Sequence, residues 1–214
     1  MDRALRFYGD LFGWTFDVGP EEYGSYTTCS LRGRRAAGLS GMHDASTGAF
    51  WNVYLATEDC DRTAARIREA GGTVLMEPMD VGAEGRMALA RDPVGAQFGI
   101  WQGRDHVGCE VVNEPGALRR NDLVTADPGP ARQFYTAVFG FTLDGNDDLP
   151  DLDFTFLRRP DGHEMGASPA FREHRRAGPR CSRSTARTPR SGGHARPAAR
   201  PTTRRASSTA GWRP

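Results

Sequence analysis

The chain contains one pattern twice, RALRFYGDLFGWTFD at residues 3–17 and PARQFYTAVFGFTLD at residues 130–144. In both copies apolar residues recur at steps of three and four, which is the spacing along one face of an amphipathic helix. Each copy then reaches a glycine, Gly13 or Gly140, a residue favoured just past a helix end, and continues as an alternating strand. A pattern that returns after 127 residues predicts a fold built from repeated helix-to-strand units.

The sequence between the two copies alternates between strand and helix patterns. Strand-like segments follow the first copy at 24–33 and 34–42, and a strand at 49–59 leads into a second predicted helix at 60–72, which three more strands follow. After a linker at 105–117 the pattern starts again. We therefore expect a protein planned as four units, of which the first lacks its opening strand, the third is partial and the fourth is absent.

Length and composition narrow the class of protein. A chain of 214 residues has room for one to two domains of about 100–150 residues each. It has no apolar run near the roughly 20 residues that cross a bilayer, and no secretory signal pattern at its start. The cysteines are scattered and form no C-x-x-C pair, so neither a disulfide framework nor a thiolate metal site is indicated. They are Cys29, Cys60, Cys109 and Cys181. A reduced cytoplasmic protein is expected, with no membrane partner.

The net charge of +1 averages two opposite parts. Residues 171–214 carry 12 Arg against one acid, and residues 1–170 carry 16 Arg against 26 acids. The basic part has no Val, Ile, Leu or Met, so it cannot bury enough apolar area to fold. We expect a disordered tail or one translated out of frame. Nucleic-acid binding is disfavoured, because the tail has few aromatic residues and no RNA-binding motif.

Three motifs in order carry a resemblance to a known family. They are the repeated FYGDLFGW and FYTAVFGF, the helix exit EAGGTVLMEP at 69–78 and the strand ARDPVGAQFGIWQ at 90–102. Over about residues 1–168 the chain resembles the glyoxalase/bleomycin-resistance/dioxygenase superfamily, also called the vicinal-oxygen-chelate (VOC) superfamily. Within it, the chain is similar to two-domain actinobacterial members described as glyoxalase-like proteins or hydroxylases.

The resemblance implies an α+β fold of paired βαβββ modules whose concave faces enclose a pocket. It places a first VOC domain of two modules at 1–104, without its initial strand, and the linker at 105–117. A partial second VOC domain is expected at 118–170, and the tail at 171–214 stands outside both. The sequence leaves open whether the chain forms a homodimer and whether the true start lies upstream of Met1.

Enzymes of this superfamily typically hold a divalent metal with a His or Glu on the first strand of a module and a Glu on the last. Counting along the matched segments, those positions fall on Asn52 and Arg120 for first strands and on Gly99 for a last strand. An amide, a cation and a missing side chain are poor metal ligands. The five histidines form no other ligand set, and His163–Glu164, the one adjacent pair, fits a solvated turn better. No metal and no other cofactor is predicted, with a divalent metal kept as the minority alternative.

Strand alternation predicts which side chains face the pocket. Val53 and Leu55 are expected to pack against the helices, so the residues that alternate with them face the other way. Polar atoms beside aromatic rings are typical of small-molecule clefts. The predicted ligand-binding residues are Asn52, Tyr54, Gln97, Trp101, Arg120 and Asp122. The competing interpretation is that Trp101 and Tyr54 complete a core, with their polar groups satisfied locally.

The leading functional hypothesis is a metal-free protein that binds or sequesters a small apolar or aromatic molecule. One alternative is a metal-dependent lyase or dioxygenase of the glyoxalase type, whose ligands lie on the missing strand. Another is an inactive, degenerate fragment. The sequence identifies neither the ligand nor a reaction.

Overall fold

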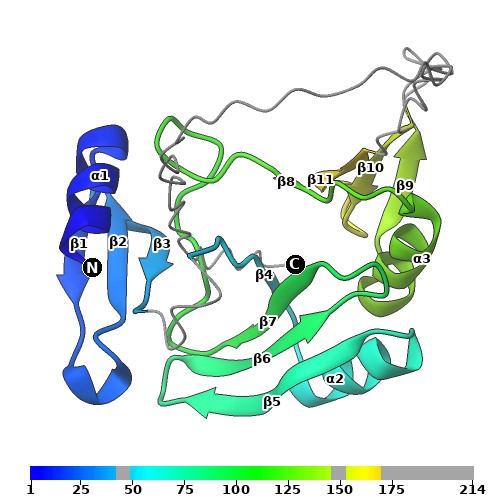
Figure 1. Cartoon of the computed structure of the whole chain (residues 1–214), viewed down its shortest axis with the longest axis horizontal. Coiled ribbons are helices and arrows are strands. Elements are labelled where there is room, and N and C mark those ends of the chain that lie inside the picture. The colour runs from blue at the N-terminus through cyan, green and yellow to red at the C-terminus, as the bar shows by residue number, and fades with distance from the viewer. Residues whose placement is uncertain (42–48, 146–152, 170–214) are drawn as a thin grey trace, which may run out of the picture.

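A computed structural model describes residues 1–41, 49–145 and 153–169, which form helices and three β-sheets (Figure 1). The expected tail at 171–214 lies outside these residues, as do His43, His174, His194 and Cys181. None of the described helices is long and apolar enough to cross a membrane.

Module 1 begins with helix α1 (Asp2–Phe12) and continues as an antiparallel sheet in the order β1-β2-β3. Its strands are β1 (Thr15–Val18), β2 (Thr27–Leu31) and β3 (Arg34–Leu39), with a short 3₁₀ turn η1 (Glu21–Tyr23) after β1. The predicted helix stop is confirmed, because Gly13 has a φ of 71° at the end of α1. Gly140 repeats this geometry with a φ of 69° at the end of α3.

Module 2 runs strand, helix and three strands, and its sheet has the order β4-β7-β6-β5. Its elements are β4 (Tyr54–Ala56), α2 (Cys60–Glu69), β5 (Thr73–Val81), β6 (Gly85–Arg91) and β7 (Gln97–Gly103). The first strand pairs in parallel with the last, and the other pairings are antiparallel. The helix forms the connection between two non-neighbouring strands, which is the predicted βαβββ arrangement.

Module 3 repeats this topology, with the sheet order β8-β11-β10-β9 and β8 parallel to β11. Its elements are β8 (Asn121–Asp122), α3 (Pro128–Phe139), β9 (Thr142–Gly145), β10 (Phe154–Arg158) and β11 (Glu164–Pro169). All five elements of a module are present, so the expectation of a partial third module was wrong.

Among the described residues, no fourth strand pairs with β3 in the module 1 sheet, and residues of the expected linker lie along that edge. The backbone N–H of Glu110 donates to the Arg35 carbonyl at 2.8 Å, and the Arg35 N–H donates to the Glu110 carboxylate at 2.8 Å. Further along, the Trp14 indole donates to the Gly116 carbonyl at 2.7 Å, and Val111 is buried in the module 1 core. This part of 105–117 is therefore structural as well as connecting.

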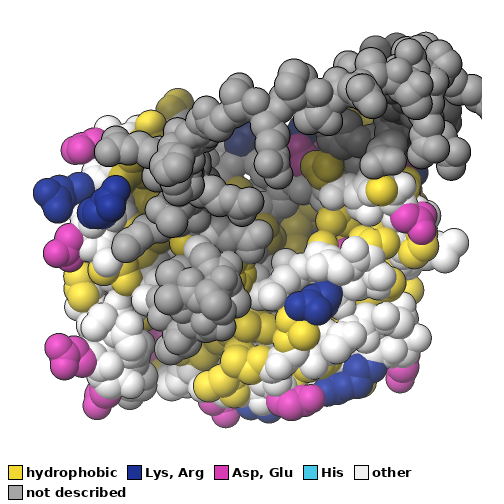
Figure 2. Space-filling view, in the orientation of Figure 1, with side chains coloured by type: hydrophobic (Ala, Val, Ile, Leu, Met, Phe, Trp, Pro, Cys, Tyr) yellow, Lys and Arg dark blue, Asp and Glu magenta, His cyan; other side chains and the backbone are white. Residues whose placement is uncertain are grey.

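Modules 2 and 3 share one hydrophobic core, in which α2 and α3 contact each other. Phe134 of α3 is 1% exposed and meets Phe98 of β7 edge-on, with ring centres 6.0 Å apart. The buried Tyr135 hydroxyl donates to the carboxylate of Asp92, at 3.2 Å. Figure 2 shows that hydrophobic side chains also reach the surface on one face of the molecule. Leu75 and Met79 of β5 are among the exposed hydrophobic residues, at 42% and 48%.

Candidate functional site

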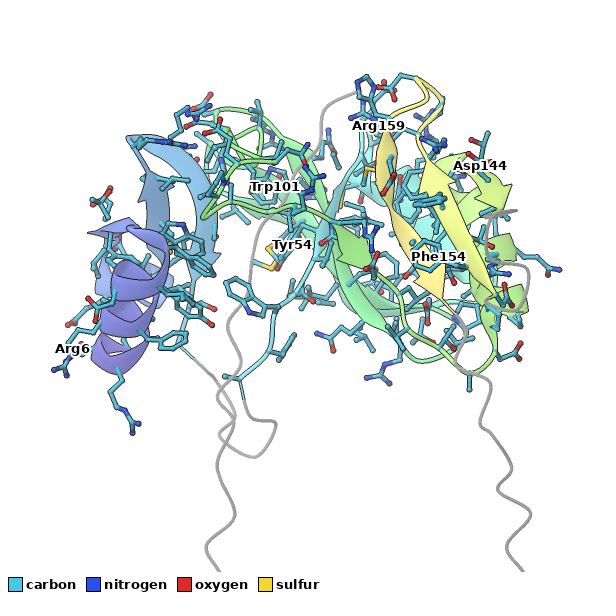
Figure 3. All side chains as sticks on the ribbon, turned by 90° about the horizontal axis from the view of Figure 1, so that it is seen from above. Arg6, Tyr54, Trp101, Asp144, Phe154 and Arg159 are labelled. Carbon is cyan, nitrogen blue, oxygen red and sulfur yellow. The ribbon has the colours of Figure 1, made fainter. Side chains whose placement is uncertain are left out.

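The concave face of module 2 is defined by the register between β4 and β7. Tyr54 lies opposite Gly99 and Ala56 lies opposite Trp101. Leu55 and Ile100, which alternate with them, are in the core beneath α2. The two strands therefore present Tyr54 and Trp101 on the face away from the helix, as alternation predicted. Figure 3 labels both side chains near the middle of the molecule.

Asn52 precedes β4 and has an unusual environment for a buried amide. It is 3% exposed, yet neither its amide oxygen nor its amide nitrogen makes a hydrogen bond with any described residue. The Asn52 amide lies near the Tyr54 phenol and lowers its pKa, which opposes part of the larger rise caused by burial. No hydrogen bond of normal geometry joins the two groups. A buried polar group without a partner costs about 1–3 kcal/mol, so this amide is a candidate for binding a ligand or water.

Tyr54 is a neutral donor over the physiological pH range. Burial raises the pKa of its phenol to about 12, and the nearby Tyr26 adds to this rise. The unfolded-state pKa is about 10, so the neutral phenol's contribution to stability is complete below about pH 10 and is lost as the pH rises towards the folded value.

Tyr54→Phe should therefore flatten the alkaline fall in the free energy of unfolding, by up to about 1.4 kcal/mol per pH unit. Urea unfolding of the two proteins between about pH 9 and pH 12 measures the slope, and equal slopes would contradict the prediction.

The residues at the metal-ligand positions of module 2 do not fit a divalent metal. An ideal Cβ on Gly99 would lie 2.3 Å from two ring carbons of Tyr54, so the ring fills the space that a carboxylate would need. Asn52 supplies only a neutral amide. Within the described part of the chain, no three His, Cys, Asp or Glu side chains are grouped in a way that could hold a metal. These positions therefore offer a ligand direct contacts with side chains and no metal-binding set of charged groups.

The predicted residues of module 3 mainly contact one another. Arg120 and Asp122 form an ion pair at 2.9 Å, and Asp122 also accepts the Ala167 N–H at 3.1 Å. The Arg120 guanidinium lies 5.6 Å from the centre of the Phe154 ring. These side chains belong to β8 and its neighbours, so the structure does not bring them onto the module 2 face. His163 is exposed and paired with Asp161 in a turn, which agrees with the solvated-turn interpretation.

A cavity of about 400 Å³ lies where modules 2 and 3 meet, and we call it the inter-module cavity. Module 2 contributes the ends of β4 and β7, and module 3 contributes the end of α3 and the β10–β11 hairpin. It is lined by Leu55, Ala56, Thr57, Glu58, Trp101, Gly103, Val107, Phe139, Phe141, Arg159, Pro160 and Met165. Of the six predicted ligand-binding residues, Trp101 lines it, whereas Asn52, Tyr54, Gln97, Arg120 and Asp122 do not.

Trp101 contributes an apolar surface to this cavity. Its indole N–H donates to the His106 carbonyl at 2.7 Å, and the side chain is 5% exposed. Its polar atom is thus satisfied locally, as the competing interpretation expected, while the ring still forms part of the wall. Gln97 lies at the start of β7 opposite Arg91. No sequence pattern pointed to Arg159, because this residue reaches the cavity through a hairpin turn.

Comparison with known proteins identifies the family. Residues 1–100 match the model of the Glyoxalase/Bleomycin resistance protein/Dioxygenase superfamily. The chain belongs to this superfamily. It is 34% identical over 171 residues to "Putative glyoxylase CFP32" of Mycobacterium tuberculosis, which covers 78% of this chain and 66% of that protein. It is 40% identical over 152 residues to "Anthracycline biosynthesis protein DauV" of Streptomyces sp. strain C5, covering 64% of this chain and 55% of that protein.

Solved structures of the superfamily show the same fold. The Mn(II)-bound glyoxalase from Novosphingobium aromaticivorans has a TM-score of 0.52 at 21% identity and covers 79% of this chain and 57% of its own. At 21% sequence identity, this similarity shows a shared fold only. This superfamily member spans about two thirds of the length of one curated relative and about half of the other, so their whole activities do not transfer to it directly.

Proposed function

We propose that this superfamily member binds a small, mainly apolar molecule in the inter-module cavity, and that it does so without a metal. The observation that carries the proposal is the cavity itself. Its volume of about 400 Å³ falls within the range of about 300–1,000 Å³ that is usual for ligand sites. The alternative, a metal-dependent lyase or dioxygenase, receives no support from the residues at Asn52 and Gly99.

The chemistry of the cavity wall favours an aromatic ligand. Trp101, Phe139 and Phe141 offer rings, and Met165 offers a polarisable thioether. Thr57, Glu58 and Arg159 add a few polar groups, which is the usual balance between apolar contact and orientation. The similarity to a protein named for anthracycline biosynthesis also supports a ligand with fused aromatic rings.

Asn52 and Tyr54 form a second place where a ligand could gain hydrogen bonds. The unpartnered Asn52 amide can both donate and accept, and the Tyr54 phenol stays protonated. We propose that they provide polar contacts on the concave face, together with Gln97. Arg120 and Asp122 are proposed to act only on the module 3 face.

The uncharged fluorophore 1-aminoanthracene tests the function. It should bind saturably at one site, quench tryptophan fluorescence, and bind equally well with and without EDTA. Ala56→Phe, which adds a ring inside the cavity, should weaken binding at least about ten-fold through steric exclusion.

Val18→Phe is the matched control, since Val18 is 56% exposed on β1 and distant in sequence from the cavity wall. It should bind as the parent does. Absence of saturable binding, unchanged binding by Ala56→Phe, or loss of binding with EDTA would each contradict the proposed function.

A further inference from the structure

Arg159 is held at the wall of the inter-module cavity by the hairpin that carries it. It directly follows β10, its N–H donates to the His163 carbonyl at 2.9 Å, and its own carbonyl accepts the Gly162 N–H at 2.8 Å. Gly162 has a φ of 84°, a conformation that closes the turn. These backbone hydrogen bonds hold Arg159 in place at the wall of the cavity, and Figure 3 labels it at the β10–β11 hairpin.

The guanidinium of Arg159 is largely buried and only partly paired. Its side chain is 13% exposed, and its Nη2 contacts the Asp161 carboxylate. Asp161 is the more exposed partner at 38%, and it also accepts the His163 N–H at 3.0 Å. A guanidinium has five N–H donors. Among the described residues, no other acceptor bonds the remaining N–H groups of the Arg159 guanidinium, so they are available to bind a ligand.

The second charged residue of the wall has less influence on a bound molecule. Glu58 is exposed, so water and salt screen its carboxylate. Arg159 is removed from most of the solvent, and its interactions with a ligand are therefore stronger. Arg159 should therefore determine which charged group of a ligand the cavity prefers. Its planar array of N–H donors matches a carboxylate.

We propose that the inter-module cavity takes an aromatic carboxylic acid, with the carboxylate bound by Arg159 and the ring system against Trp101 and Phe141. This inference rests on the proposed binding function and adds the chemical class of the ligand. The rings supply contact area, and Arg159 selects the acid over a neutral molecule of the same shape.

Three probes with one ring system separate these roles, namely naphthalene-2-carboxylate, naphthalene-2-carboxamide and 2-naphthylmethylammonium. We expect the carboxylate to bind at least about ten-fold more tightly than the carboxamide, measured by calorimetry, because a charge-assisted bidentate contact replaces a neutral one. Arg159→Gln should remove this difference, because the carboxylate then loses its charge-assisted contact while the rings of both probes keep theirs.

Asp161→Asn is the opposing control, because it keeps Arg159 and removes the competing carboxylate. It should tighten carboxylate binding several-fold. Equal affinity for carboxylate and carboxamide, or preference for the ammonium probe, would overturn the acid assignment while leaving the binding function intact. Failure of all three probes with the folded protein would overturn both. Circular dichroism of each variant establishes folding.

Discussion

Phe134→Ala should destabilise modules 2 and 3 together, lowering the free energy of unfolding by about 3–5 kcal/mol. Phe134 is 1% exposed and belongs to α3, but its ring contacts Phe98 of module 2 and lies against Gly72 after α2. Removing the ring creates a cavity between the modules, and the buried apolar area of the ring is also lost. Because the contacts cross from one module to the other, neither module can lose them alone.

Chemical unfolding followed by circular dichroism measures the loss, and hydrogen exchange assigns it to strands. Protection in β6 of module 2 and β10 of module 3 should fall by the same factor. Phe7→Ala is the matched control, since Phe7 is 58% exposed on α1 and should cost less than about 1 kcal/mol. Separate transitions for the two modules, with only module 3 weakened, would show that the shared core does not couple them.

The parts of the fold that the sequence predicted are those set by local pattern. Gly13 and Gly140 end equivalent helices because both adopt a left-handed backbone, and the repeat made that visible. The faces of β4 and β7 followed from alternation, since Leu55 and Ile100 had to be buried together. Alternation around Arg120 and Asp122 indicated the first strand of module 3, whereas the completion of its sheet by β11, which pairs with β8, was missed.

The candidate cavity was beyond the reach of local pattern. Its wall combines the ends of β4 and β7 with a hairpin turn of another module, and only tertiary packing brings them together. Trp101 was found because its strand had a clear period. Arg159 was not, since the sequence around it, RRPDGH, indicates a turn and gives no sign of what the side chain meets. Likewise, the acidic linker gave no sign that Glu110 would pair with Arg35 along the edge of β3.

Gly99→Glu is expected to cost at least about 3 kcal/mol, because it forces a carboxylate into space that the Tyr54 ring fills. A Cβ alone at this position would lie 2.3 Å from the Tyr54 ring, and the two residues directly opposite Gly99, Tyr54 and Leu89, offer no positive charge to an added carboxylate. The variant also restores the residue type that metal-dependent relatives are expected to carry on a last strand. It therefore tests whether this chain could regain a metal ligand by one change.

Gly99→Ala separates the steric part of the loss from the part due to charge, and Tyr54→Ala in each background completes a double-mutant cycle. We expect the two Gly99 substitutions to lower the free energy of unfolding markedly less when Tyr54 is already Ala, because the Tyr54 ring is what a side chain at position 99 would contact. Urea unfolding with and without Mn²⁺ gives both readouts.

If Gly99→Glu is tolerated with Tyr54 intact and is stabilised by the metal, the ring moves aside easily, and the metal-dependent alternative regains support. If the cost disappears only with Tyr54→Ala, a tyrosine ring occupies the metal position, and binding without metal follows from the packing of β4 on β7.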